Sequence, residues 1–197
     1  STSTPQSGRV QVVVVALSQP IAPFGVIADD CPLGDSSFAA ARDRTLRALQ
    51  LTPPRPKAAP TTTVTGPALV LSDELWVTTR ALKAFLKATK TSATTTTLAL
   101  PPSRLTELLL PLQDLDDGRY PCAFVPAGTT TTAAQALAAP PVTIAYKEIH
   151  ATLPVPRHLL GRSTSTTTWP LTSTVALRVR HWLHVLRASH LAPQVWL

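Results

Sequence analysis

Proline recurs along most of the chain and limits the length of any regular segment. There are 20 prolines among 197 residues. Because proline lacks a backbone N–H and has a fixed φ, it interrupts helices and is excluded from the interior of sheets. The chain is therefore divided into short elements joined by irregular connections. This pattern favours a sandwich of short strands linked by proline-rich loops.

The composition provides enough apolar material for a packed core. Hydrophobic residues make up 44% of the chain and charged residues 15%, against a usual value of about 25% charged. The length predicts one domain over residues 1–197, with residues 1–9 as a flexible polar lead-in. Cys31 and Cys122 lack metal-ligand spacing and are expected to be packed thiols in a reducing compartment. No apolar run reaches the roughly 18 residues of a membrane span, so no membrane partner is expected.

Several segments have the composition of strands. The run Val10–Leu17 (VQVVVVAL) is rich in β-branched residues and is bounded by prolines, which is typical of a buried strand. Residues Cys122–Pro126 and Val142–Leu153 are also predicted as strands. The segment Phe38–Leu51 is compatible with a helix, although its second half alternates partly as a strand does.

Two segments fit both periodicities. In Trp76–Lys90, a helix would place apolar residues on one face and four cations on the other, whereas a strand would alternate the same residues. From Val175 to Leu186, apolar and polar residues also alternate, and this alternation favours a strand that continues through two arginines. Helical spacing of the apolar residues leaves a helix open for this stretch as well.

Two architectures are consistent with these elements. The preferred one is an all-β, eight-stranded antiparallel jelly-roll sandwich. The alternative is a three-layer α/β domain with alternating strands and helices. Its elements would be Val10–Leu17, Phe38–Gln50, Ala68–Leu71, Asp73–Lys90 and Leu98–Leu100.

Positive charge dominates the last quarter of the sequence. The formal net charge is +7, which favours an anionic partner. From Ile149 onward there are arginines, histidines and tryptophans but no Asp or Glu. Arginine suits phosphate contact, and tryptophan suits base stacking or a subunit interface. We predict nucleic-acid-facing roles for Arg157, Arg162, Arg178, Arg180 and Arg187, and interface roles for Trp169, Trp182 and Trp196.

No catalytic signature is present in the sequence. A phosphate-binding loop needs glycines at fixed spacing, but the chain has only 7 glycines and contains neither GxGxxG nor GxxxxGK[ST]. The nucleophile elbow GxSxG and the zinc motif HExxH are also missing. The sequence therefore predicts no catalytic, cofactor-binding or metal-binding residue, and it favours a protein that is not an enzyme.

One segment carries a family resemblance. Residues 125–136 read Val-Pro-Ala-Gly-Thr-Thr-Thr-Thr-Ala-Ala-Gln-Ala, which resembles a segment of tymovirus-type coat proteins that follows a strand and opens a loop of the jelly roll. Arg44–Pro54 and Thr174–Leu186 are similar to two further strands of that family. Pro, Thr, Ala and Ser share cytosine at the second codon position, and their abundance fits the base composition of such genomes.

The resemblance implies a function as well as a fold. It implies a structural capsid protein that self-assembles into an icosahedral shell around single-stranded RNA, located in the virion and, during assembly, in the host cytoplasm. Two other functions stay open. One is a basic RNA-associated subunit of a large ribonucleoprotein assembly. The other is a degenerate sugar-nucleotidyltransferase-like α/β domain, for which the loop Ser18–Gly25 offers one glycine and no lysine.

Overall fold

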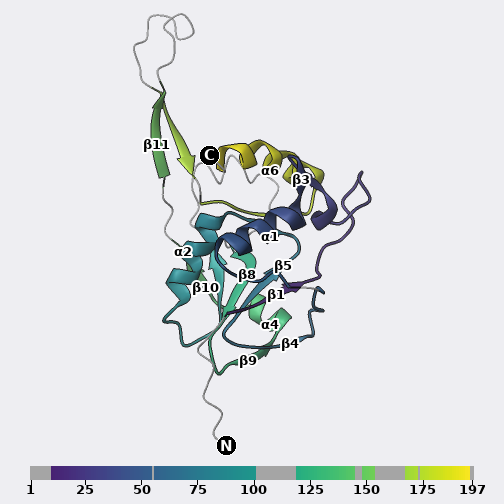
Figure 1. The fold of residues 1–197 in the computed structure, drawn as a ribbon, viewed down its shortest axis with the longest axis vertical. Helices are drawn as coiled ribbons and strands as arrows, with labels where there is room; N and C mark the ends of the chain where they lie inside the picture. The colour runs from purple at the N-terminus through teal and green to yellow at the C-terminus, as the bar shows by residue number, and fades with distance from the viewer. Residues whose placement is uncertain are drawn as a thin grey trace, which may run out of the picture.

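The structure is a computed structural model that describes residues 10–54, 56–100, 119–144, 148–153, 167–172 and 174–195. Residues 1–9, predicted as a flexible lead-in, lie outside this part of the chain. Figure 1 shows a central sheet with helices packed against it.

A five-stranded mixed sheet forms the centre of the fold. Strands β1 and β5 are parallel, as are β7 and β10, whereas β8 lies between β5 and β7 and is antiparallel to both. It follows that β1, β5, β7 and β10 all point the same way. In sheet order the strands are β1 (Gln11–Val15), β5 (Ala68–Ser72), β8 (Arg119–Val125), β7 (Thr96–Ala99) and β10 (Pro141–Thr143).

This sheet contradicts the predicted antiparallel jelly roll. Consecutive residues of β1 (Val12–Val15) and all residues of β5 are buried. A half-exposed sandwich strand alternates between buried and exposed residues, whereas a strand covered on both faces is apolar throughout. The valine run of β1 therefore belongs to a sheet with a layer on each side, which is the α/β alternative.

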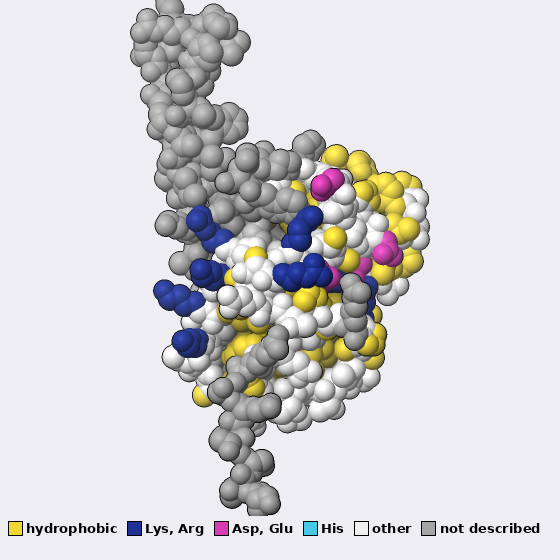
Figure 2. All heavy atoms as spheres, in the orientation of Figure 1, with side chains coloured by type: hydrophobic (Ala, Val, Ile, Leu, Met, Phe, Trp, Pro, Cys, Tyr) yellow, Lys and Arg dark blue, Asp and Glu magenta, His cyan; other side chains and the backbone are white. Residues whose placement is uncertain are grey.

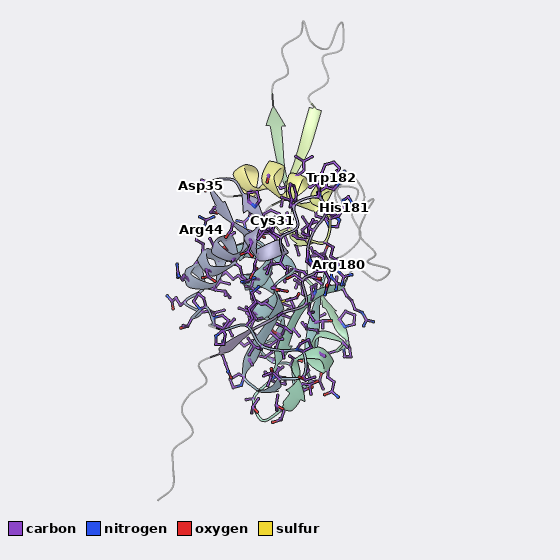
Figure 3. The ribbon with its side chains drawn as sticks, turned by 90° about the vertical axis from the view of Figure 1, so that its right-hand side faces the viewer. Cys31, Asp35, Arg44, Arg180, His181 and Trp182 are labelled. Carbon is purple, nitrogen blue, oxygen red and sulfur yellow. The ribbon has the colours of Figure 1, made fainter. Side chains whose placement is uncertain are left out.

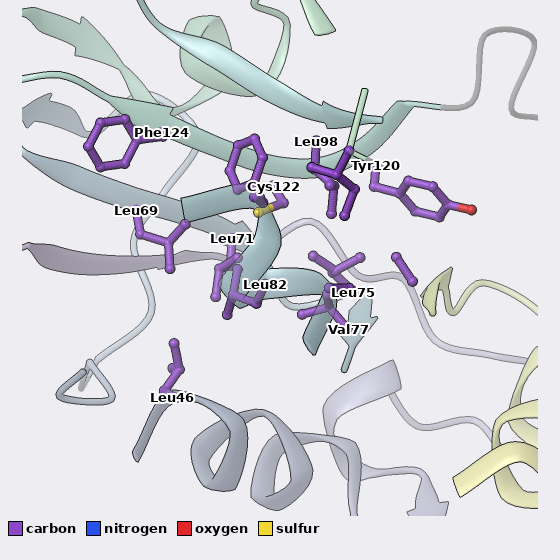
Figure 4. Close-up of a cluster of buried hydrophobic side chains, with 14 of the residues drawn as sticks. Leu46, Leu69, Leu71, Leu75, Val77, Leu82, Leu98, Tyr120, Cys122 and Phe124 are labelled. Carbon is purple, nitrogen blue, oxygen red and sulfur yellow. The ribbon is translucent and has the colours of Figure 1, made fainter. Parts of the chain in front are cut away.

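Helices supply both outer layers. Helix α1 (Phe38–Ala48) and helix α2 (Thr79–Thr89) pack on one face of the sheet, and the short helix α4 (Ala133–Leu137) packs on the other. Figure 4 shows Leu46 of α1 below the leucines of β5. The core on this side joins Val12, Val14, Leu46, Leu69, Leu71, Leu82 and Phe85, whereas α4 contacts the opposite face through Ala133 and Ala136.

Capping residues fix where the helices begin. The Ser37 hydroxyl accepts a hydrogen bond from the N–H of Ala40 at the start of α1, and the Thr78 hydroxyl accepts one from the N–H of Ala81 at the start of α2. The cap at Thr78 and the buried residues of α2 determine the structure of the ambiguous segment Trp76–Lys90. Its first residues end strand β6 (Leu75–Val77), and Thr79–Thr89 is helical, with its apolar face buried and its cations outward.

The predicted strand at Val175–Leu186 is wrong beyond its first residues. Strand β13 (Ala176–Arg178) pairs antiparallel with β6 (Leu75–Val77), and the chain then enters helix α6 (Trp182–Val195). The helix forms because Val185, Ala188 and Ala192 recur at helical spacing and pack against the core around Leu33. Alternation alone did not distinguish the two structures.

The segment that resembles coat proteins also departs from a jelly-roll loop. Strand β8 ends at Val125, as the prediction for Cys122–Pro126 required, but the following residues form a strand and then α4. The remaining short elements are η1 (Ala28–Asp30), β2 (Pro32–Leu33), β3 (Ser36–Ser37), β4 (Thr63–Thr65), β9 (Thr130–Thr132), β11 (Glu148–Leu153) and β12 (Thr167–Thr172).

Gly66 provides a test of the packing between β4, β5 and the end of β8. A Cβ at this position would collide with the backbone carbonyl of Pro126. We expect Gly66→Ala to lower the free energy of unfolding by about 3 kcal/mol, because the obstacle is backbone and cannot rotate away. Urea unfolding followed by circular dichroism measures the loss.

Gly34→Ala is the matched control, because its Cβ would meet nothing within 4 Å and its only penalty is a φ of +64°. A left-handed alanine costs about 1 kcal/mol. Equal losses in the two variants would contradict the described contact at Gly66.

Candidate functional site

Parallel strands bring their carboxyl ends to one edge of the sheet. In α/β sheets of this kind, ligands bind outside that edge. The loop after β1 and the loop after β5 meet here, and the second begins with two consecutive acids, Asp73 and Glu74. Both acids are 2% exposed. Buried carboxylates at the carboxyl edge of the sheet make this edge the candidate functional site.

Asp73 holds the loop that follows β1. Its carboxylate accepts hydrogen bonds from the backbone N–H groups of Leu17 and Ser18, at 2.8 Å and 2.9 Å, and from the Ser18 hydroxyl at 2.6 Å. The Lys57 Nζ donates a further bond at 3.0 Å. Burial alone would raise the pKa of Asp73, but these bonds outweigh it and hold that pKa below its usual value.

Lys57 connects Asp73 to a second buried carboxylate. Its Nζ lies 2.7 Å from an oxygen of Asp29, in η1, as well as 3.0 Å from Asp73. Asp29 also accepts two hydrogen bonds, one on each carboxylate oxygen, from the guanidinium of Arg42 in α1. Burial would lower the pKa of Lys57, but its bonds to the two carboxylates raise it above the usual value. This network joins α1, η1 and the ends of β1 and β5.

Glu74 anchors two of the arginines that the sequence singled out. The Nε atoms of Arg178 and Arg180 donate to one oxygen of Glu74, at 2.8 Å and 3.0 Å. The Glu74 side chain is 3% exposed, whereas those of Arg178 and Arg180 are 24% and 48% exposed. The carboxylate is thus inside the protein while the guanidinium groups extend toward solvent.

The start of α6 places aromatic rings beside Arg180. The Nδ1 of His184 accepts hydrogen bonds from the N–H groups of Arg180 and His181, and the Nδ1 of His181 accepts one from Leu183. The ring of His181 lies 5.8 Å from that of Trp182, which is 40% exposed. Figure 3 shows Arg180, His181 and Trp182 on the same side of the molecule.

Together these residues form a charged group that we call the carboxyl-edge cluster. It has four cations and three carboxylates. The carboxylates are its most buried side chains, followed by Arg42. A ligand approaching from solvent meets cationic groups first, so the edge favours an anion. The cluster consists of Asp29, Arg42, Lys57, Asp73, Glu74, Arg178 and Arg180.

The predicted site residues are only partly within the described chain. Arg178 and Arg180 meet at Glu74 on this edge, Trp182 begins α6 two residues after Arg180, and Arg187 lies further along α6. The side chain of Trp169, in β12, and the residues Arg157, Arg162 and Trp196 lie outside what the structure describes. Their predicted roles therefore stay predictions.

Sequence reasoning missed the acidic half of the cluster. Asp29, Asp73 and Glu74 carry no motif, and Lys57 lies in a proline-rich connection. One available signal was the pair Asp73-Glu74, which follows the apolar run Ala68–Leu71 after a single serine, because acids at the carboxyl end of a buried parallel strand point to a site.

Other kinds of site find no support in the described residues. No group of three His, Cys, Asp or Glu side chains there is arranged to hold a metal ion. Cys31 and Cys122 are buried free thiols, and burial raises the pKa of each, so neither is a ready nucleophile. None of the described helices is long and apolar enough to cross a membrane.

Comparison of the chain with models of known protein families, with curated proteins and with solved structures finds no match. The function is therefore argued from the geometry of the carboxyl edge alone.

The lowered pKa of Asp73 predicts how stability depends on pH. A carboxyl whose pKa is depressed by folding stabilises the folded state above its unfolded pKa, about 3.9, and loses this contribution as pH falls through its folded pKa. We expect Asp73→Asn to lower the free energy of unfolding by about 1.5–3 kcal/mol at neutral pH, because the four donors around Asp73 lose a charged acceptor while Lys57 keeps its contact to Asp29. The stability of the variant should also fall less than that of the unaltered protein when the pH is lowered. Urea unfolding between pH 2 and pH 7 measures both effects.

Asp43→Asn is the control, since Asp43 makes only a 3.9 Å surface pair with Arg47. Such pairs contribute about 0–1 kcal/mol. If Asp73→Asn and Asp43→Asn had the same pH profile as the unaltered protein, the clamp at Asp73 would not be supported.

Proposed function

We propose that this protein is a nucleotide-binding α/β domain of a degenerate sugar-nucleotidyltransferase-like kind, which holds a nucleotide or nucleotide sugar at the carboxyl edge without turning it over. One observation carries the proposal. Arg178 and Arg180 share the buried carboxylate of Glu74 at the edge where the carboxyl ends of the parallel strands meet. The exposed indole of Trp182 follows Arg180 by two residues and lies on the same side of the molecule (Figure 3).

The phosphates are assigned to Arg178 and Arg180. Each guanidinium uses its Nε to contact Glu74. The Arg178 and Arg180 side chains are 24% and 48% exposed, so each guanidinium also reaches solvent. Planar guanidinium groups match the geometry of phosphate oxygens. Anchoring also lowers the entropy that each side chain would lose on binding.

The base is assigned to Trp182. Its indole is 40% exposed, and the ring of His181 lies 5.8 Å from it. Stacking of a base on an aromatic ring contributes about 1–3 kcal/mol and does not depend strongly on which base it is. A nucleotide joins a base to phosphates, so Arg180 and Trp182, two residues apart in the sequence, suit this class of ligand.

Binding without turnover follows from the loop after β1. Phosphate-transferring sites use glycine-rich loops whose backbone N–H groups close on a phosphate. Here Ser18–Gly25 has one glycine, and the N–H groups of Leu17 and Ser18 are donated to Asp73 instead. A carboxylate occupies the donors that a phosphate would need, so this loop is unsuited to catalysis.

The capsid expectation is not carried forward. It required a jelly roll, and the sheet is mixed, with helices on both faces. The α/β alternative predicted from the sequence has helices on both faces of a sheet, as the structure does. Folds of this kind bind ligands at the carboxyl edge of the sheet.

Titration with nucleotides tests the proposal. We expect UDP, ADP, TDP and the corresponding glucose derivatives to include a ligand with a Kd below about 1 mM, measured by isothermal titration calorimetry. Arg180→Gln should weaken that binding at least tenfold, because a charge-assisted bond to phosphate contributes about 1.5–3 kcal/mol. Trp182→Phe should reduce the change in tryptophan fluorescence on binding.

Lys90→Gln, which removes one exposed cation from the end of α2, is the control and should leave nucleotide affinity unchanged. The proposal fails if no nucleotide binds at millimolar concentration. It also fails if Lys90→Gln and Arg180→Gln weaken binding equally, because the effect would then reflect overall charge.

A further inference from the structure

The outward face of α2 carries a continuous row of cations. Arg80, Lys83, Lys87 and Lys90 are separated by three, four and three residues, which places them on one side of the helix. All four are exposed. In Figure 2 the dark blue side chains follow one another down the left of the molecule, where Figure 1 places α2. We call these four residues the α2 stripe, and it shares no residue with the carboxyl-edge cluster.

The core holds the stripe in place. Ala81, Leu82, Phe85 and Thr89 on the opposite side of α2 are buried. The Thr89 hydroxyl donates a hydrogen bond of 3.0 Å to the carbonyl of Phe85. Because the apolar face is packed against the sheet, the helix cannot rotate its cations away from solvent. The stripe is therefore a fixed feature of the surface.

This charge pattern is unfavourable for the helix itself. There is no Asp or Glu between Thr79 and Lys90 to pair with the cations along the helix. Like charges such as Lys83 and Lys87 at i,i+4 destabilise a helix by about 0.2–0.5 kcal/mol. Arg80, in the first turn, also faces the positive end of the helix dipole. Lysines that oppose helix stability, as Lys83 and Lys87 do, are better explained by a partner than by folding.

The dimensions and chemistry of the stripe indicate the partner. From Arg80 to Lys90 it spans about 15 Å at 1.5 Å per residue. A nucleic-acid strand carries one phosphate charge about every 3.4 Å, so several phosphates lie within that span. The outward face has no exposed aromatic or large apolar residue to insert into a bilayer or to anchor a protein interface.

We propose that the α2 stripe binds nucleic acid through its phosphodiester backbone, without reading the base sequence. Lysines that act as point charges suit this role, since each neutralises a phosphate and releases a counterion. The expected binding is weak and strongly dependent on salt. RNA and DNA present the same backbone chemistry, and their relative affinities identify which of the two is the partner.

Fluorescence anisotropy with labelled oligonucleotides provides the test. The probes are a 20-nucleotide single-stranded RNA and a single-stranded DNA of the same sequence, titrated at several KCl concentrations between 25 and 200 mM. Each lysine contact that is removed should reduce the slope of log K against log salt by about 0.7. Lys83→Gln/Lys87→Gln should therefore lower the slope by about 1.4 and weaken binding at least tenfold at the lowest salt.

The matched control is Arg44→Gln/Arg47→Gln, which removes the same charge from exposed positions on α1. We expect it to change the slope much less. Equal losses in both double variants would overturn the proposal, because binding would then depend on net charge alone. Absence of RNA and DNA binding would also overturn it, as would binding to vesicles rich in phosphatidylserine without binding to either oligonucleotide.

The two proposals can fail independently. Lys83→Gln/Lys87→Gln should keep the nucleotide affinity of the carboxyl edge, and Arg180→Gln should keep most oligonucleotide binding. Circular dichroism of each variant confirms that the fold is retained before affinities are compared.

Discussion

The carboxylate of Asp73 is the interaction on which the functional edge depends. Removing a carboxylate from water costs several kcal/mol unless hydrogen bonds and an opposite charge replace its hydration. Here Leu17, Ser18 and Lys57 replace that hydration through four donors. Because these donors come from separate segments, Asp73 fixes the loop after β1 and the connection that carries Lys57. Through Lys57 it is joined to Asp29 and to helix α1.

The neighbouring acid, Glu74, gives the same edge its outward character. It holds Arg178 and Arg180 at the surface while it remains inside the protein. Adjacent residues of one loop therefore have different roles. Asp73 accepts the N–H groups of the loop after β1, and Glu74 holds two partly exposed arginines. This division is the basis of the proposal that the domain binds a phosphate-bearing ligand without turning it over.

The sequence predicted local structure better than it predicted topology. Val10–Leu17 was expected to be a strand and contains β1, because a valine run has one strongly favoured conformation. The valine run did not show whether the strand beside β1 would be parallel or antiparallel, because strand pairing depends on contacts between residues distant in sequence. Val175–Leu186 was misassigned because strand and helical spacing coincide there. Arg180 was found through the charge distribution, but its partner Glu74 was not, because no motif joins residues 106 positions apart.

The most direct test of this account is to map the amide signals that shift when a nucleoside diphosphate is added to ¹⁵N-labelled protein. The account predicts shifts concentrated in residues 178–184, while the amides of Leu17 and Ser18 change little because Asp73 already holds them. Large shifts at Leu17 and Ser18, with none at Arg178, Arg180 or Trp182, would show that the loop after β1 is an open phosphate site and would contradict the account.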